Sequence, residues 1–128
     1  MKATRRLINF YGLTDPAIQT AGQFSDTTIQ AMYDALLADG LSSPEAALGS
    51  AAFVEESDIL DLINELSSTS NINLTFVYSK LLNGSKRHLK GLVHILDNYG
   101  VVYQPQLLDS TLYYDIINMT WPAPPASN

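Results

Sequence analysis

The sequence predicts an all-α fold dominated by two long amphipathic helices. Residues 42–66 and 71–99 carry apolar side chains at the spacings of three and four that place them on one side of a helix. A short polar connector, SSTSN, separates the two stretches and allows the chain to turn back. The run VVYQPQLL is β-prone, but it contains a proline and has no second strand to pair with. We therefore expect a hairpin of two antiparallel helices with shorter helices around it.

The length of 128 residues and the hydrophobic content of 46% suit one globular domain over residues 1–128. We expect it to consist of a helix remnant at 1–11, a crossover with a short helix at 12–41, the two hairpin helices at 42–66 and 71–99, and a strap and tail at 100–128.

The first segment is predicted to be helical over residues 2–11. Leu7 and Ile8 lie on its apolar side, and Gly12 is expected just past its end. Because a helix of about ten residues is marginal on its own, this one must dock on the rest of the chain or continue something longer.

The crossover is expected to be irregular through Gly22 and then helical. Either Ser25 or Asp26 can cap this short helix, and Asp39 and Gly40 close it. Its apolar side is formed by Ile29, Met32, Tyr33, Leu36 and Leu37.

The first long helix has a clear beginning and an unusual apolar stripe. Ser43 is a good N-cap, and Pro44 fits the first helical position, where a missing N–H costs nothing. At about 100° per residue, one narrow stripe contains Leu48, Ala51, Glu55, Ile59, Leu62 and Leu66, with Asp58 at its edge. Glu55 is therefore predicted to point toward the core. Glu56 and Asp61 lie off the stripe and are predicted to be solvent or rim residues.

The second long helix is expected to begin at Asn71 or Asn73 and to extend to residue 99. His88 falls in the middle of its apolar stripe, whereas His94 falls on its polar side. A break near Gly84 is the main alternative to one continuous helix, because glycine weakens a helix interior. A cluster of basic side chains on the polar side is predicted to be solvated: Lys86, Arg87 and Lys90.

Beyond residue 100 we expect an extended strap that crosses the bundle and includes Pro105. Asp109 or Ser110 can start a last helical turn. The prolines after Trp121 predict an extended tail.

The charge balance and the cysteine count exclude several classes of function. The formal net charge is −6 and the seven basic residues are scattered apart from one cluster, so we expect no nucleic-acid partner. With no cysteine, the chain has no disulfide and no thiolate chemistry. We expect no signal peptide and no membrane span. Cysteine usage leaves the cytoplasm and the cell exterior open, and the cytoplasm is favoured.

Glu55 and His88 are the residues most relevant to chemistry. In an antiparallel hairpin they lie within about one helical turn of each other, so they can converge in the core. An ionised carboxylate in an apolar core needs a partner: a metal ion, protonated His88, Ser85, a tyrosine hydroxyl, or its own neutral acid form. Imidazole and carboxylate together suit iron, manganese or zinc. The alternative is a buried Glu55–His88 polar pair with no metal, in a helical module without enzymatic activity.

Three motifs carry a resemblance to a known family. VEESDILDL (residues 54–62), NGSKRHL (residues 83–89) and YQPQLL (residues 103–108), in this order, are similar to the second half of an uncharacterised ferritin-like domain family found in prokaryotes. The resemblance covers most of the chain. RRLINFYGLTDP resembles the end of that family's second bundle helix and the crossover after it.

The resemblance implies a four-helix bundle whose long helices supply inward ligands to a di-metal centre. It implies iron or manganese as the metal and places Glu55, with Glu56 beside it, and His88 among the ligands. Asp58, at the edge of the same stripe, is a further candidate. The last helix of the general pattern carries Glu-x-x-His, and Ser85 stands where this glutamate would be, so one bridging carboxylate is missing.

The family's first helix and most of its second have no counterpart in this sequence. The chain is therefore expected to be a fragment, a half-bundle that dimerises, or a degenerate member that keeps the fold without metal. In each case two amphipathic helices alone leave apolar surface uncovered. We expect a homodimer or a higher oligomer.

Overall fold

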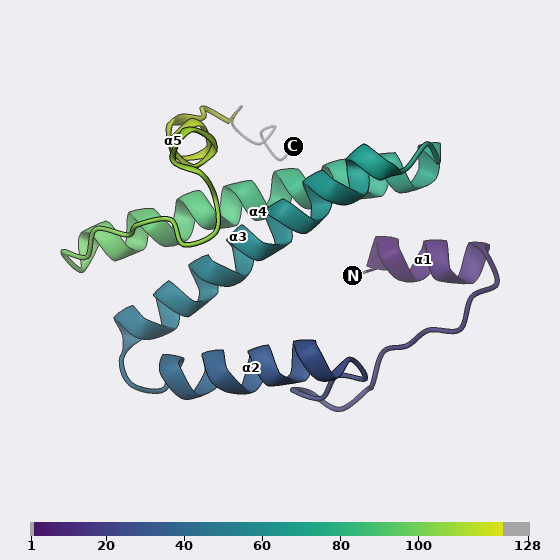
Figure 1. Ribbon diagram of the computed structural model, residues 1–128, viewed down its shortest axis with the longest axis horizontal. Helices are drawn as coiled ribbons and strands as arrows, with labels where there is room; N and C mark the ends of the chain where they lie inside the picture. Colours follow the sequence, from purple (N-terminus) through teal and green to yellow (C-terminus); the bar gives the residue numbers. More distant parts are fainter. Residues whose placement is uncertain (1, 122–128) are drawn as a thin grey trace, which may run out of the picture.

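The computed structural model describes residues 2–121, and within them the chain is helical with no strand (Figure 1). The all-α class is thus confirmed. The helices are α1 (Lys2–Phe10), α2 (Thr27–Gly40), α3 (Pro44–Ser68), α4 (Ile72–Asn98) and α5 (Ser110–Asn118).

Helices α3 and α4 form an antiparallel hairpin that organises the fold (Figure 1). Ser43 caps α3 as expected, because its side chain accepts a hydrogen bond of 3.0 Å from the N–H of Ala46. Asn71 caps α4 by accepting from the N–H groups of Asn73 and Leu74. Helix α4 runs through Gly84 without interruption, so the alternative of a break there was wrong.

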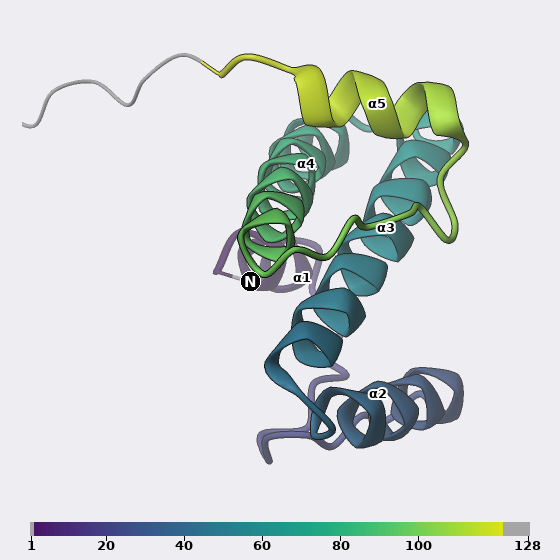
Figure 2. The same ribbon diagram turned by 90° about the vertical axis from the view of Figure 1, so that its left-hand side faces the viewer.

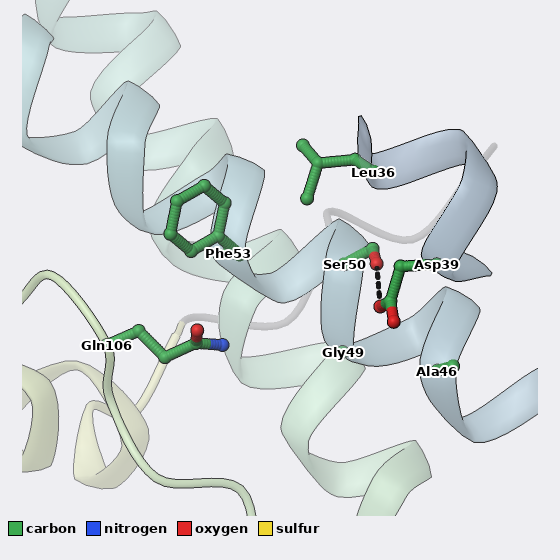
Figure 3. Close-up of a pocket in the computed structure, with 7 residues that line it drawn as sticks. All are labelled: Leu36, Asp39, Ala46, Gly49, Ser50, Phe53 and Gln106. Atoms are coloured by element: carbon green, nitrogen blue, oxygen red, sulfur yellow. Dashed lines mark hydrogen bonds between the residues drawn. The ribbon is translucent and has the colours of Figure 1, made fainter. Parts of the chain in front are cut away.

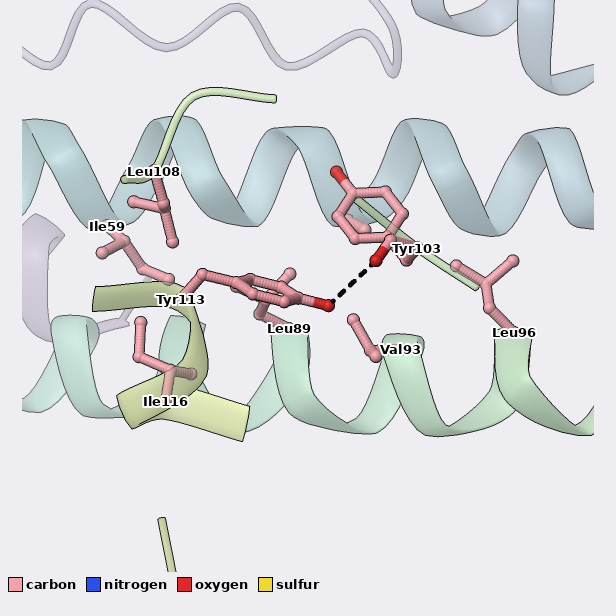
Figure 4. Packing of buried hydrophobic residues seen from close by; sticks show 9 residues of the cluster. Ile59, Leu89, Val93, Leu96, Tyr103, Leu108, Tyr113 and Ile116 are labelled. Atoms are coloured by element: carbon pink, nitrogen blue, oxygen red, sulfur yellow. Dashed lines mark hydrogen bonds between the residues drawn. The ribbon is translucent and has the colours of Figure 1, made fainter. Parts of the chain in front are cut away.

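The segment between α4 and α5 crosses the hairpin as a strap and brings α5 onto it (Figure 2). Gly100, with φ of 75°, ends α4 in the left-handed conformation that glycine adopts easily. The strap and α5 then close a core in which the hairpin forms one wall (Figure 4). The buried apolar cluster consists of Ala52, Ile59, Leu89, Val93, Leu96, Tyr103, Leu108, Tyr113 and Ile116.

Two basic residues of α4 contact the chain that follows α5. Arg87 is exposed, as predicted, whereas Lys90 is partly buried and not fully solvated as predicted. The ammonium group of Lys90 donates a hydrogen bond of 2.7 Å to the carbonyl oxygen of Met119. The guanidinium group of Arg87 lies 4.6 Å from the ring centre of Trp121, a cation–π contact. The predicted extended tail beyond Trp121 lies outside the described residues.

Helices α1 and α2 lie on the side of the hairpin away from α5 (Figures 1 and 2). Helix α1 docks near the connector, where the hydroxyl of Tyr11 accepts hydrogen bonds from the side-chain amides of Asn71 (2.7 Å) and Asn73 (3.2 Å). Helix α2, capped by Asp26, packs near the start of α3. None of the helices within residues 2–121 is long and apolar enough to cross a membrane.

Candidate functional site

Glu55 and His88 come from facing helices of the hairpin, as the sequence predicted. His88 Nδ1 lies 3.0 Å from Glu55 Oε1, which is a hydrogen bond and, when the imidazole is protonated, an ion pair. Helix α3 supplies the carboxylate and helix α4 the imidazole, so this pair links the two long helices. With Nδ1 engaged by the carboxylate, Nε2 is the ring nitrogen left for another partner.

The pair lies at the surface rather than in the core. The side chain of His88 is 67% exposed and that of Glu55 is 19% exposed. The prediction that His88 lies in the middle of a buried stripe was therefore wrong. His88 lies at the exposed edge of its stripe, on the same face of α4 as Ile95, which is 42% exposed, and Tyr99, which is 55% exposed. On the same side of α4, a Cβ added at Gly84 or Gly91 would meet no atom within 4 Å.

Asp58 lies one helical turn from Glu55 on α3 and is exposed. Partial desolvation raises the pKa of its carboxyl above the ordinary value, and the negative charges of Glu55 and Asp61 raise this pKa further. These carboxylates thus repel one another along one side of α3. The negative potential of these three carboxylates attracts cations to this side of α3.

Glu56 is the buried carboxylate of the fold. It is 0% exposed, and its oxygens accept hydrogen bonds from the strap. The hydroxyl of Tyr103 donates to Oε1 at 2.6 Å, and three successive backbone N–H groups, of Gln106, Leu107 and Leu108, donate to the two oxygens at 2.7 to 3.1 Å. We call this arrangement the Glu56 cradle. Charge-assisted hydrogen bonds of this kind are among the strongest in proteins.

The sequence placed Glu56 at the solvent or the rim, and this prediction was wrong. The prediction assumed one narrow apolar stripe, which fits a helix that packs against a single neighbour. Helix α3 instead packs against both α4 and the strap. The buried arc of α3 is therefore wider and includes Ala52, Glu56 and Ile59. Because both oxygens of Glu56 are bound by the strap, this residue is not available as a metal ligand in this structure, although the sequence named it as one.

Two tyrosines extend the polar network inside the core. The hydroxyl of Tyr113 donates a hydrogen bond of 3.3 Å to the carbonyl oxygen of Tyr103 (Figure 4). Burial raises the pKa of Tyr103, and the hydrogen bond to Glu56 raises it further. Burial also raises the pKa of Tyr113. Both phenols therefore remain protonated at neutral pH and act as donors.

The four residues that the sequence named as metal ligands do not form one cluster. Within residues 2–121, no group of three or more His, Asp or Glu side chains is arranged to hold a metal ion. Glu55 and His88 are together, Asp58 is nearby on the same helix, and Glu56 belongs to the cradle on the other side. Of these four residues only Glu55 and His88 meet, through a hydrogen bond to each other, whereas a protein metal site usually needs at least three ligands.

The cradle is the feature that sequence reasoning missed. Its two halves, VEES and YQPQLL, lie within motifs that the resemblance picked out, but backbone N–H groups carry no signature in a sequence. The one available signal was an acidic residue about 100° from the stripe of a helix that was already expected to lie under a strap.

Comparisons with known proteins place the chain among uncharacterised proteins. Residues 1–120 match the family described as "Uncharacterized protein domain (DUF2202)". The chain is 34% identical over 119 residues to Uncharacterized protein MJ0754 of Methanocaldococcus jannaschii, covering 92% of this chain and 64% of that protein. The crystal structure of hypothetical protein MJ0754 from the same organism superposes with a TM-score of 0.91 over 94% of this chain and 69% of that chain. This chain thus spans about two thirds of its relative.

The cradle makes a prediction about stability. Replacing Glu56 by Ala leaves the N–H groups of the strap without their acceptor, so we expect the free energy of unfolding to fall by about 3–5 kcal/mol in urea denaturation. Glu56→Gln keeps one acceptor oxygen and should cost less. Glu56→Gln should also accelerate hydrogen exchange at the amides of residues 106–108, while exchange at other amides stays unchanged.

Glu65→Ala, an exposed change on the same helix, is the matched control and should change stability by less than about 0.5 kcal/mol. Equal losses in Glu56→Ala and Glu65→Ala would show that the cradle does not hold the strap.

Proposed function

The chain belongs to the uncharacterized DUF2202 domain family, and on that premise we propose that it is a ferritin-like helical protein whose Glu55–His88 pair binds iron or manganese. The observation that carries this proposal is the hydrogen bond of 3.0 Å between a carboxylate and an imidazole on facing helices. In ferritin-like bundles, metal sites are built from such side chains, which project from facing helices toward the bundle interior.

The geometry of His88 suits a metal ligand. Metal-binding histidines commonly donate one ring N–H to a carboxylate, which fixes the ring and leaves the other nitrogen for the metal. Glu55 Oε1 occupies this position beside Nδ1. Nε2 of His88 is then the donor atom for the metal, Glu55 is the carboxylate that orients the ring, and neighbouring Asp58 adds negative charge. An imidazole with carboxylates suits iron or manganese.

The remaining donors must come from elsewhere, and we propose a second copy of the chain as their source. The side of the hairpin that carries His88 also exposes apolar side chains, among them Ile95 and Tyr99. A homodimer through this surface would bring two Glu55–His88 pairs together and complete a four-helix core.

The exposed area supports association. The accessible surface of the chain is 8949 Å², whereas the scaling law for compact monomers gives about 6700 Å² for 14.0 kDa. The surplus of about 2200 Å² exceeds the roughly 800 Å² that each partner buries in a standard interface.

One observation favours a second function, a helical interaction module without a metal. Glu55 and His88 satisfy each other at 3.0 Å, and a polar pair at the edge of an interface requires no ion. In this case the same surface would mediate self-association, and the pair would set its register.

A measurement of metal binding distinguishes the two proposed functions. In calorimetric titrations with Mn²⁺ or Fe²⁺ under anaerobic conditions, we expect two variants to weaken binding at least tenfold, because His88→Ala removes the donor nitrogen and Glu55→Gln removes the carboxylate charge that orients it. His94→Ala, which removes the exposed histidine of the same helix, should leave affinity unchanged. Light scattering on the same samples reports the oligomeric state.

A dimer that binds no metal would contradict the metal site and support the interaction module. A monomer that binds no metal would contradict both.

The repulsion around Asp58 makes an independent prediction. Its pKa is raised in the folded chain, so the unfolded state loses its proton first as pH rises. The free energy of unfolding therefore falls as pH rises from the unfolded pKa to the raised folded pKa. Asp58→Asn should stabilise the metal-free protein at pH 7, by about 0.5 kcal/mol after solvent screening, and should have no such effect at about pH 3. Urea denaturation at both pH values tests this, and destabilisation at pH 7 would refute it.

A further inference from the structure

An open cleft of about 350 Å³ lies beside the first half of α3 (Figure 3). Helix α2, the first turns of α3 and the strap meet around it. Its lining consists of Leu36 and Asp39 from α2, Ala46, Gly49, Ser50 and Phe53 from α3, and Gln106 from the strap. This volume is within the range of small-molecule sites.

Polar groups stand at the two sides of the cleft, and each side offers an acceptor oxygen. The hydroxyl of Ser50 donates a hydrogen bond of 2.9 Å to Asp39 Oδ2, and among the described residues this carboxylate forms no ion pair. Across the cleft, the amide end of Gln106 points toward α3 (Figure 3). Its nitrogen donates to the hydroxyl of Tyr103 at 3.4 Å. The amide oxygen is free to accept a hydrogen bond, and the second N–H of the amide is free to donate one.

The strap holds its wall of the cleft in place. The backbone N–H of Gln106 donates to both oxygens of Glu56, at 3.1 and 3.0 Å. This residue is therefore fixed at its backbone, and its side chain is positioned beside the cleft by the Glu56 cradle. The cleft is thus bounded by a buried charged anchor and not by a free loop.

Between the two polar sides the lining is apolar. Phe53 and Leu36 approach from opposite helices (Figure 3). At Gly49 an added Cβ would meet no atom within 4 Å, so the depth of the cleft depends on a missing side chain in the interior of α3. Glycine costs a helix about 1 kcal/mol relative to alanine.

We propose that this cleft binds a small organic ammonium ion with an apolar body, such as an arylalkylamine. The ammonium group would donate hydrogen bonds to Asp39, and the apolar body would lie on Phe53 and Leu36. An anion is disfavoured by the Asp39 carboxylate and by the net charge of −6. The cleft is separate from the Glu55–His88 pair, and the proposal does not depend on metal binding.

The test uses phenethylamine as the probe. Phenethyl alcohol, which has the same shape without the charge, is the control compound. For phenethylamine we expect a Kd of about 1 mM, which lies within the bound that ligand efficiency sets for an amine of this size. In NMR titrations of the whole chain, we expect amide shifts confined to the residues around the cleft. We expect the alcohol to bind at least tenfold more weakly. Equal affinity for both compounds would overturn the proposal.

Two pairs of variants locate the binding. Gly49→Leu should fill the cleft and weaken phenethylamine at least tenfold, whereas Gly49→Ala should weaken it less. Asp39→Asn should also cause at least a tenfold loss, while Asp34→Asn, on the exposed side of α2, should cause none. Equal weakening by the two aspartate variants would show attraction to the acidic surface in general and would overturn the proposal. Retained binding in Gly49→Leu would also overturn it.

Discussion

The closed side of this fold depends on the carboxylate of Glu56. Removing an ionised carboxylate from water is costly unless every lone pair finds a donor, and the chain meets this demand with one tyrosine hydroxyl and three successive backbone N–H groups. The same hydrogen bonds fix the strap across α3. Leu108 and the two tyrosines can therefore pack against Ile59 and Leu89, and α5 is placed over the hairpin.

The two sides of the hairpin then differ in character. On one side the strap supplies the hydrogen-bond donors that the buried carboxylate of Glu56 needs. On the other, Glu55 and His88 meet at the surface, next to carboxylates that repel one another and to exposed apolar residues of α4. Neighbouring residues of one helix, Glu55 and Glu56, thus have different roles. The first is available for chemistry, and the second is a structural anchor.

Local signals in the sequence were sufficient for the helices but not for the depth of each residue. Ser43, Pro44 and Gly100 marked helix ends correctly because capping depends on adjacent residues. The meeting of Glu55 with His88 followed from helical periodicity and an antiparallel turn. The burial of Glu56 and the exposure of His88 depended on where a strap about fifty residues away would cross. Periodicity contains no information about this tertiary contact.

The most direct test of the proposed metal centre is a crystal structure of the protein grown with Mn²⁺, with data collected to locate the manganese by its anomalous scattering. We expect a peak within bonding distance of Nε2 of His88, in a site shared between two copies of the chain. A structure in which the copies associate without a peak at this nitrogen, or in which manganese lies elsewhere, would contradict the assignment.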